Sequence, residues 1–243
     1  MKRPYVICHV LSSLDGRIDG DWFDMPQMKE IRPAGNKARD EYGCHAMVNG
    51  AITCEEIYAD RFLKEGELPK AEVSYPREDC ILDLGLKDYA LCVDLNGTLA
   101  WSANSVKRAG RAEVQIIEVL GEDVRDEYIG YLQERKISYL FAGQNNSLNV
   151  ETLLEKAGRL LKVDKIVVSG GGIIDWTFLK SGYLDELSLV VAPFTDGDRK
   201  MSAVFDRSSF IDDNEPVYFE LLGIDQLPLG ALRLRYRPSN VRD

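Results

Sequence analysis

Short apolar runs alternate with amphipathic segments along the chain as far as residue 192. The runs are rich in Val, Ile and Leu, which predicts buried strands. The segments between them repeat their apolar residues at helical spacing, which predicts helices. Strands that alternate with helices indicate an α/β fold with a mostly parallel sheet. The predicted strands are 5–11, 45–50, 89–94, 112–119, 138–142, 165–168 and 184–193, and the predicted helices are 36–42, 53–62, 126–135, 150–161 and 173–181.

Two alternating runs near the C-terminus predict an antiparallel hairpin. Val217, Phe219 and Leu221 form one run; the other is Leu232, Leu234 and Tyr236, after a loop with proline and glycine. The predicted fold is therefore a mostly parallel sheet with helices on both faces and an antiparallel edge. Residues 64–80 are charged and interrupted by prolines, which predicts a surface excursion. Because no linker or repeat interrupts the pattern, we expect one domain over residues 1–243.

Three consecutive glycines, Gly170 to Gly172, follow the strand predicted at 165–168 and precede the helix predicted at 173–181. The backbone N–H groups at such a helix start are unpaired, and glycine lets an anion approach them. The run is a candidate phosphate-binding turn. It is not a G-x-G-x-x-G motif, because Asp175 stands where the last glycine would be, nor a Walker loop. The alternative is a tight turn that needs glycine only for its backbone angles.

A second strand-to-helix turn is predicted at Gly50 to Thr53. Thr53 and Glu56 have the spacing of a capping box, so a structural role as a helix cap is the alternative for Thr53. Loops that follow parallel strands lie at one edge of a sheet, where ligands bind. Two candidate phosphate-binding turns at that edge suggest a dinucleotide. The alternative is a ligand-binding protein that catalyses no reaction, which would show the same pattern.

Composition narrows the class of protein. The chain has 243 residues and a formal net charge of −10, which argues against a nucleic-acid surface. No apolar run approaches the roughly 20 residues of a membrane span, and the run at 5–11 alternates like a strand rather than a signal peptide. Five dispersed cysteines without a C-x-x-C pair indicate reduced thiols in a cytoplasmic protein. Cys44 and His45 are adjacent but have no further ligands nearby, so we expect no metal site.

Five short motifs occur in an order and spacing that resemble the RibD C-terminal reductase family of riboflavin biosynthesis. They are Ser13-Leu14-Asp15-Gly16-Arg17-Ile18, Gly50-Ala51-Ile52-Thr53, Gly170-Gly171-Gly172, Gly182-Tyr183-Leu184-Asp185-Glu186-Leu187 and Ala192-Pro193. The resemblance implies a three-layer α/β/α fold of the dihydrofolate reductase type. It also implies an NADPH-dependent oxidoreductase like 5-amino-6-(5-phosphoribosylamino)uracil reductase, which transfers a hydride to the sugar C1. A small phosphorylated substrate and a homodimer follow from the same resemblance.

The resemblance also implies which residues bind the cofactor. Those expected beside the nicotinamide are Ser13, Asp15 and Gly16; those near the phosphates and ribose are Gly50, Thr53 and Asp94; those at the pyrophosphate are Ser169, Gly170, Gly171, Gly172 and Ile173. Lys107 and Arg108 are candidates for the 2′-phosphate, or a solvated basic pair. Asp185 and Glu186 are expected to be structural. The nominees for a proton donor are Asp15, Glu55 and Glu56, of which we predict Asp15 and Glu56 as catalytic; the alternative for Asp15 is a carboxylate that braces its loop.

Two departures concern the substrate. The family usually has Glu-Gly-Gly, whereas this chain has Ser169 before its glycines. The family also usually has an Asp-Asp-Pro segment soon after the turn that holds Thr53, and this chain lacks that segment. A site without these polar groups should discriminate differently among hydroxylated substrates. The alternatives are therefore a reductase of a different substrate, such as a dihydrofolate-like pterin or another carbonyl or imine compound, or a non-catalytic nucleotide-binding protein of the same fold.

Overall fold

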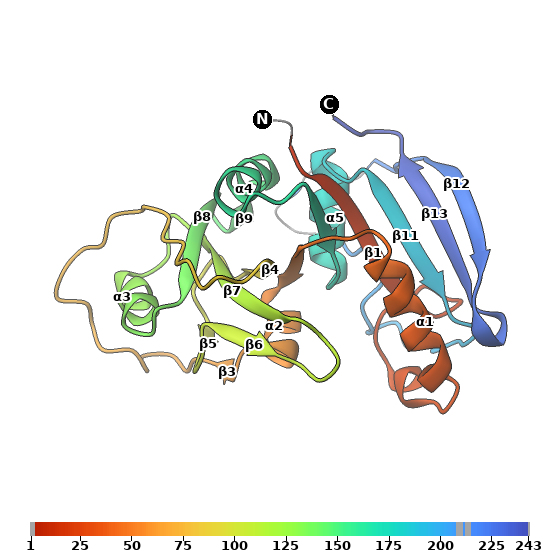
Figure 1. The fold of residues 1–243 in the computed structure, drawn as a ribbon, viewed down its shortest axis with the longest axis horizontal. Helices are drawn as coiled ribbons and strands as arrows, with labels where there is room; N and C mark the ends of the chain where they lie inside the picture. The colour runs from red at the N-terminus through yellow and green to blue at the C-terminus, as the bar shows by residue number, and fades with distance from the viewer. Residues whose placement is uncertain (1–2, 208–210, 212–214, 243) are drawn as a thin grey trace. The chain divides into compact units, whose positions relative to one another are not determined.

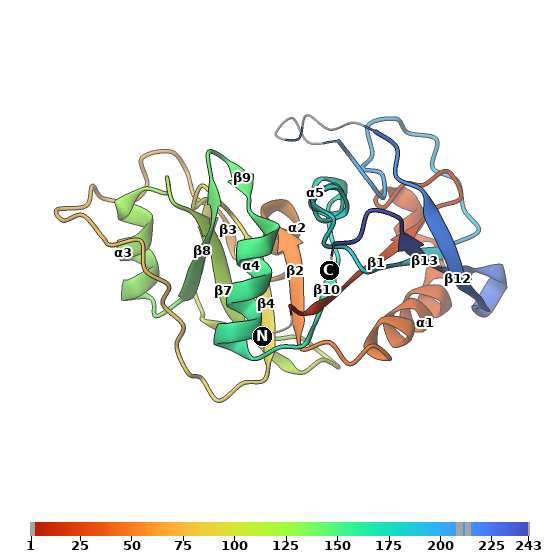
Figure 2. The same cartoon turned by 90° about the horizontal axis from the view of Figure 1, so that it is seen from above.

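The computed structural model describes residues 3–207, 211 and 215–242. The chain forms two compact units, which are drawn in Figures 1 and 2. The terminal unit contains Tyr5–Cys44 and the described residues from Asp164 onward; the middle unit contains His45–Val163 with Arg3 and Pro4. That residues 1–243 are a single domain stays a prediction.

The sheet of the terminal unit has the strand order β12-β13-β11-β1-β10. Strand β1 (Tyr5–Ser12) lies between β10 (Lys165–Val168) and β11 (Glu186–Val191) and is parallel to both. It is buried over nearly its whole length, as expected for a central parallel strand. Strands β13 (Leu232–Pro238) and β12 (Phe219–Gln226) continue the sheet as an antiparallel pair. The predicted central strand and C-terminal hairpin are confirmed.

Helices α1 (Met28–Asp40) and α5 (Gly172–Ser181) lie on opposite faces of this sheet (Figure 2). Gly182 ends α5 in the left-handed conformation, with φ 78°, as its position after the apolar run predicts. Short 3-10 turns at Asp21–Asp24 and Pro228–Gly230 complete the unit. Because β1 and β10 are parallel, the loops that follow them emerge at the same end of the sheet.

Helix α1 begins eight residues earlier than the helix predicted at 36–42, since it starts at Met28. Pro33 lies inside α1, and a proline inside a helix is a local signal against one. The helix persists because Met28, Ile31, Gly35 and Ala38 form one buried face at helical spacing.

The sheet of the middle unit has the strand order β2-β4-β7-β8-β9, with β6 antiparallel to β7. Its first four strands are parallel, and a short hairpin links the last two. Their bounds are β2 (Ala46–Gly50), β4 (Asp88–Val93), β6 (Ser105–Lys107), β7 (Glu113–Gly121), β8 (Ser138–Gln144) and β9 (Ser147–Leu148). Strands β3 (Arg61–Phe62) and β5 (Leu99–Ala100) form a separate antiparallel pair. The prediction of an α/β fold with a mostly parallel sheet is confirmed.

The helices of the middle unit are α2 (Ala51–Ile57), α3 (Asp126–Glu134) and α4 (Val150–Lys156). The helix predicted over 150–161 ends as an α-helix at Lys156 and continues as a π-helix, Ala157–Leu161. The predicted capping box is wrong, because Gly50 is the N-cap of α2 and Thr53 lies at the third helical position. None of the helices among the described residues is long and apolar enough to cross a membrane.

Candidate functional site

The loop after β1 is a tight polar turn held by Ser13. The Ser13 hydroxyl is buried; it donates to Asp15 Oδ1 at 2.6 Å and accepts from the Arg17 N–H at 3.0 Å. The Ser13 carbonyl accepts from the N–H of Gly16, whose φ of 79° favours glycine. The structure therefore brings Ser13, Asp15 and Gly16 into one compact turn at the end of β1.

Asp15 joins this turn to the chain that follows β11. Its carboxylate accepts from the N–H groups of Asp196, at 3.1 Å, and Gly197, at 2.8 Å. Together with the Ser13 hydroxyl, these donors hold the pKa of Asp15 well below its usual range. A carboxylate that stays ionised does not supply a proton near neutral pH. The geometry matches the alternative role, a loop-bracing carboxylate.

Residues 196–206, which we call the strap, contact both the turn after β1 and the glycine turn before α5. The strap accepts hydrogen bonds from the Arg17 guanidinium at Met201 O and from the Ile18 N–H at Ser202 O. Farther along, the N–H of Val204 donates to Gly16 O, and the N–H of Asp206 donates to Gly172 O. The strap thus ties the turn after β1 to the start of α5.

The glycine turn, Ser169 to Ile173, uses its glycines for different reasons. Gly171 caps α5 with φ 73°, and a Cβ there would meet nothing within 4 Å. A Cβ on Gly172 would lie 2.6 Å from Asp206 Oδ2 and closer still to the Ala203 carbonyl oxygen. Gly172 is therefore needed for packing against the strap, whereas Gly171 leaves open space beside the helix start.

The helix start itself can receive an anion. Within the described part of the chain, no acceptor takes the N–H of Gly172 or Ile173, while the next two N–H groups bond to Gly171 O. Ile173 is 51% exposed, so this edge faces solvent. Unpaired N–H groups and the helix dipole together favour a phosphate here.

The remaining candidates lie in the middle unit. Gly50 and Thr53 occupy the start of α2, and Glu56 is exposed near its end. Lys107 ends β6, and Arg108 follows it; both are exposed. Asp94 lies in the turn after β4.

Asp94 is almost fully buried, and both of its carboxylate oxygens accept hydrogen bonds from residues of the same turn. Oδ2 accepts from the N–H groups of Thr98, at 2.5 Å, and Leu99, at 2.8 Å, and Oδ1 accepts from the Thr98 hydroxyl. Burial raises the pKa of Asp94 against the effect of these donors. Whether it also contacts a ribose stays a prediction.

Comparison with known proteins decides the family. The model of the RibD C-terminal domain matches residues 102–231, which is more than half of the chain. The chain belongs to the RibD C-terminal domain family. A search of curated proteins finds no match.

Solved structures agree with the RibD fold. A RibD of Acinetobacter baumannii is 20% identical, with a TM-score of 0.62 over 98% of this chain. A pyrimidine reductase-like protein of Corynebacterium diphtheriae is 17% identical, with a TM-score of 0.67 over 99% of this chain and 93% of that one. The riboflavin biosynthesis reductase Rib7 of Saccharomyces cerevisiae is 14% identical, with a TM-score of 0.59 over 98% of this chain and 90% of that one. The chain spans 58% of the Acinetobacter protein. The predicted dihydrofolate reductase-like fold is confirmed.

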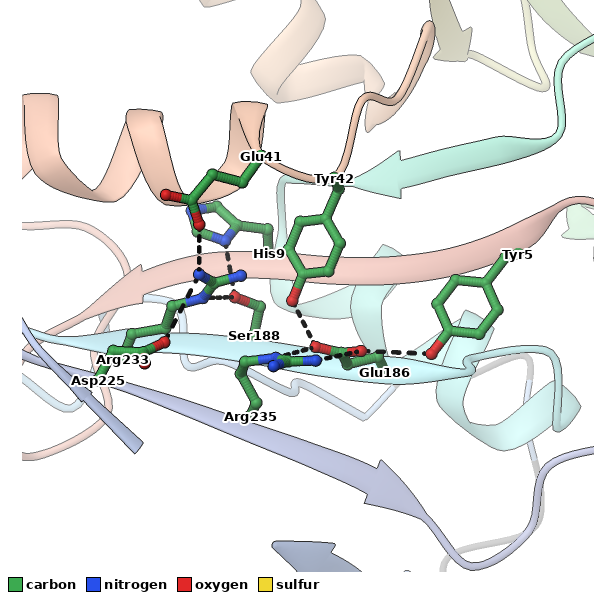
Figure 3. A network of polar contacts seen from close by, with 9 residues as sticks. All are labelled: Tyr5, His9, Glu41, Tyr42, Glu186, Ser188, Asp225, Arg233 and Arg235. Atoms are coloured by element: carbon green, nitrogen blue, oxygen red, sulfur yellow. Dashed lines mark hydrogen bonds and ion pairs between the residues drawn. The ribbon is translucent and has the colours of Figure 1, made fainter. Parts of the chain in front are cut away.

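The Asp185–Glu186 pair of the RibD signature has the structural role predicted for it. Asp185 Oδ2 accepts from the N–H of Val6 at 2.7 Å, which fixes the chain before β11 against β1. Glu186 is buried and accepts from the hydroxyls of Tyr5 and Tyr42 and from the Arg235 guanidinium, at 2.6 Å from Nε (Figure 3). The guanidinium and the two hydroxyls keep the pKa of Glu186 below its usual value.

A second polar group beside it was not predicted. His9 Nδ1 lies 3.0 Å from Ser188 Oγ, which also accepts from Arg233 Nε at 3.1 Å (Figure 3). Burial, with Arg39 and Arg233 nearby, lowers the pKa of His9 to about 3, so its ring is neutral. Arg233 is 7% exposed and pairs with Glu41 and, more weakly, with Asp225. These contacts link β1, β11, β13 and the residues just after α1.

No group of three or more His, Cys, Asp or Glu side chains among the described residues could hold a metal ion. All five cysteines are free thiols, as the sequence predicts.

Proposed function

We propose that the chain is an NADPH-dependent reductase of the pyrimidine reductase type. The observation that carries the proposal is the glycine turn in a chain of the RibD C-terminal family. Its open face beside Gly171 suits a pyrophosphate, as do the N–H groups of Gly172 and Ile173, which have no acceptor among the residues that the structure describes. The names of the similar structures, RibD and a riboflavin biosynthesis reductase, point to the same chemistry.

NADPH would supply a hydride when bound, and the protein would supply position and shielding from water. The glycine turn binds the pyrophosphate, and the turn of Ser13, Asp15 and Gly16 lies beside the nicotinamide. Asp15 stays ionised, so its part is to hold its loop against the strap. Glu56 stays the predicted proton donor, with Glu55 as the other nominee. That Gly50, Thr53 and Asp94 contact the cofactor also stays a prediction from the resemblance.

The proposed substrate is 5-amino-6-(5-phosphoribosylamino)uracil, reduced at the sugar C1. Ser169 in place of the usual Glu favours a second candidate, a reductase of another substrate, since a short, neutral hydroxyl is a weaker hydrogen-bond acceptor for a hydroxylated ligand than a carboxylate is. Oxidation of NADPH should be followed with the phosphoribosylamino-pyrimidine and with dihydrofolate in parallel. Turnover of the first alone supports the riboflavin reaction, and turnover of the second alone supports the other substrate class. With neither turned over, a non-catalytic nucleotide-binding role remains.

A homodimer in the cytoplasm is part of the proposal. Strand β12 is the last strand of the terminal unit's sheet and is mostly exposed. It carries Leu221 and Ile224, which are 49% and 57% exposed, and Tyr218 precedes it. An apolar edge strand of this kind favours pairing with a second copy.

A further inference from the structure

Asp175 is a fully buried carboxyl group inside the first turn of α5. Its exposed fraction is 0%, and neither carboxyl oxygen makes a hydrogen bond of ordinary geometry within the described part of the chain. A buried carboxyl group without firm partners is unfavourable when ionised. It also lies in the same helix turn whose outer N–H groups, at Gly172 and Ile173, are open to an anion.

The groups that face Asp175 come from three elements. The Cys8 thiol on β1 and the Gly170 N–H in the glycine turn favour the ionised form, whereas burial and the Asp206 carboxylate in the strap disfavour it. Burial is the largest effect, and it raises the pKa of Asp175 to about 7. Burial also raises the pKa of Cys8 well above its usual value, so its thiol stays neutral.

An ionised Asp175 and a bound phosphate would use the same positive end of α5. The free protein can balance the helix dipole with the Asp175 charge, since that charge lies within the first turn. A pyrophosphate on the outer face would then meet a like charge across the turn. Because Asp175 is fully buried, salt in the solvent screens its charge only weakly.

We propose that Asp175 links protonation to anion binding at the glycine turn, so that a dinucleotide binds best when Asp175 carries a proton. This inference rests on the proposed function, since it concerns how the same turn receives the pyrophosphate. It makes Asp175 a positioning residue and the turn a site whose affinity depends on pH near neutrality.

The test is the dissociation constant of NADPH between pH 6 and 8.5, for the wild-type protein, Asp175→Asn and Asp164→Asn. Asp164 is an exposed aspartate just before β10, at the other end of that strand, and serves as the matched control. The titration of the 2′-phosphate near pH 6 is common to all three proteins and cancels in the comparison.

We expect the wild-type affinity to fall roughly tenfold as pH rises, the size of effect that one like charge about 10 Å away exerts in a partly buried site. Compared with the wild type at the same pH, Asp175→Asn should bind equally at pH 6 and roughly tenfold more tightly at pH 8.5. Asp164→Asn should follow the wild type at every pH. Equal pH dependence in Asp175→Asn and the wild type overturns the inference. The inference is also overturned if the affinity of Asp206→Asn no longer depends on pH while that of Asp175→Asn still does, because Asp206 would then be the titrating group.

Calorimetry of the wild-type protein gives an independent readout if Asp175→Asn does not fold. Titrations at pH 7.5 in HEPES and in Tris, which differ in ionisation enthalpy, should reveal net proton uptake on binding. Preferred binding of the dianionic 2′-phosphate would instead release protons. The sign of the proton change therefore distinguishes protonation of Asp175 from ionisation of the 2′-phosphate. Binding without uptake overturns the inference alone. No binding of NADPH at any pH overturns the proposed function, and the inference with it.

Discussion

Asp15 Oδ2 accepts a hydrogen bond from the N–H of Gly197 at 2.8 Å, and this contact joins the turn after β1 to the strap after β11. The same carboxylate accepts from the Ser13 hydroxyl at 2.6 Å. These donors favour the ionised form, because a protonated carboxyl group has less capacity to accept hydrogen bonds. Asp15 therefore acts through its charge and its position.

The first prediction separates this role from proton donation. Asp15→Asn should lower activity, because the strap loses its anchor, while the alkaline limb of the rate profile between pH 5 and 9, where a proton donor loses its proton, stays in place. The pKa of Asp15 is already below this range, so it cannot cause that limb. Rate profiles of the wild type, Asp15→Asn and Ser13→Ala would test this. Loss of the alkaline limb in Asp15→Asn alone would show that Asp15 is the proton donor.

The second prediction concerns the two glycines of the glycine turn. Gly171→Ala should cost about 1 kcal/mol of unfolding free energy, from its left-handed φ, and should weaken NADPH binding at least tenfold by filling the open space. Gly172→Ala should cost more stability, roughly 1–3 kcal/mol, because its Cβ meets Ala203 and Asp206. Urea unfolding and ligand titration measure both effects. Normal binding by Gly171→Ala would argue against a pyrophosphate at this turn.

The third prediction concerns the ion pair between buried Glu186 and Arg235, whose side chain is 37% exposed. Glu186→Gln should reduce the free energy of unfolding by roughly 2–4 kcal/mol at pH 7, since Arg235 and two tyrosines lose a buried acceptor. The pKa of Glu186 is lower in the folded state, so its contribution is present above about pH 4.5 and is lost as pH falls through the folded value. The two proteins should therefore converge in acid. Asp225→Asn, at an exposed and distant partner of Arg233, should cost less than about 1 kcal/mol. A difference that persists unchanged in acid would contradict this account.

The fourth prediction concerns the homodimer. Ile224→Lys, on the exposed strand β12, should shift the protein toward the monomer in sedimentation experiments, because it places a charge on an apolar edge. Val73→Lys is the matched control, since Val73 is 60% exposed but lies in the excursion at 64–80. A dimer that tolerates Ile224→Lys, or a wild-type protein that is monomeric, would place the interface elsewhere or exclude it.

Local sequence signals predicted the elements around the glycine turn. The four aliphatic-rich residues before Ser169, the helical spacing after Gly172 and the glycine at 182 each act over a few residues, and the structure has β10, α5 and its cap there. Helix α1 was missed in part because Pro33 is a strong local signal against a helix, whereas the buried face that stabilises α1 depends on tertiary packing.

The rest of the candidate site depends on contacts between distant residues. Tyr5 and Glu186 are 181 positions apart, and Asp15 and Gly197 are 182 apart, so no local pattern relates them. The capping box failed for a simpler reason. Gly50 is already the N-cap of α2, so Thr53 lies inside the helix. It is therefore not at the position from which a side chain caps the free N–H groups of the first turn. In the sequence, Asp175 stands out only because it occupies the place of the last glycine in a G-x-G-x-x-G motif. That its carboxyl group is fully buried follows from the three-dimensional structure alone.

The central claim is that this RibD-family chain binds NADPH at the glycine turn. A fluorescence titration of the purified protein with NADPH tests it most directly, with Gly171→Ala as the comparison. The wild-type protein should bind NADPH saturably well below ~1 mM, the weak end of ordinary cofactor affinities, and Gly171→Ala should bind it at least tenfold more weakly. Absence of binding to the wild-type protein at ~1 mM would contradict the account.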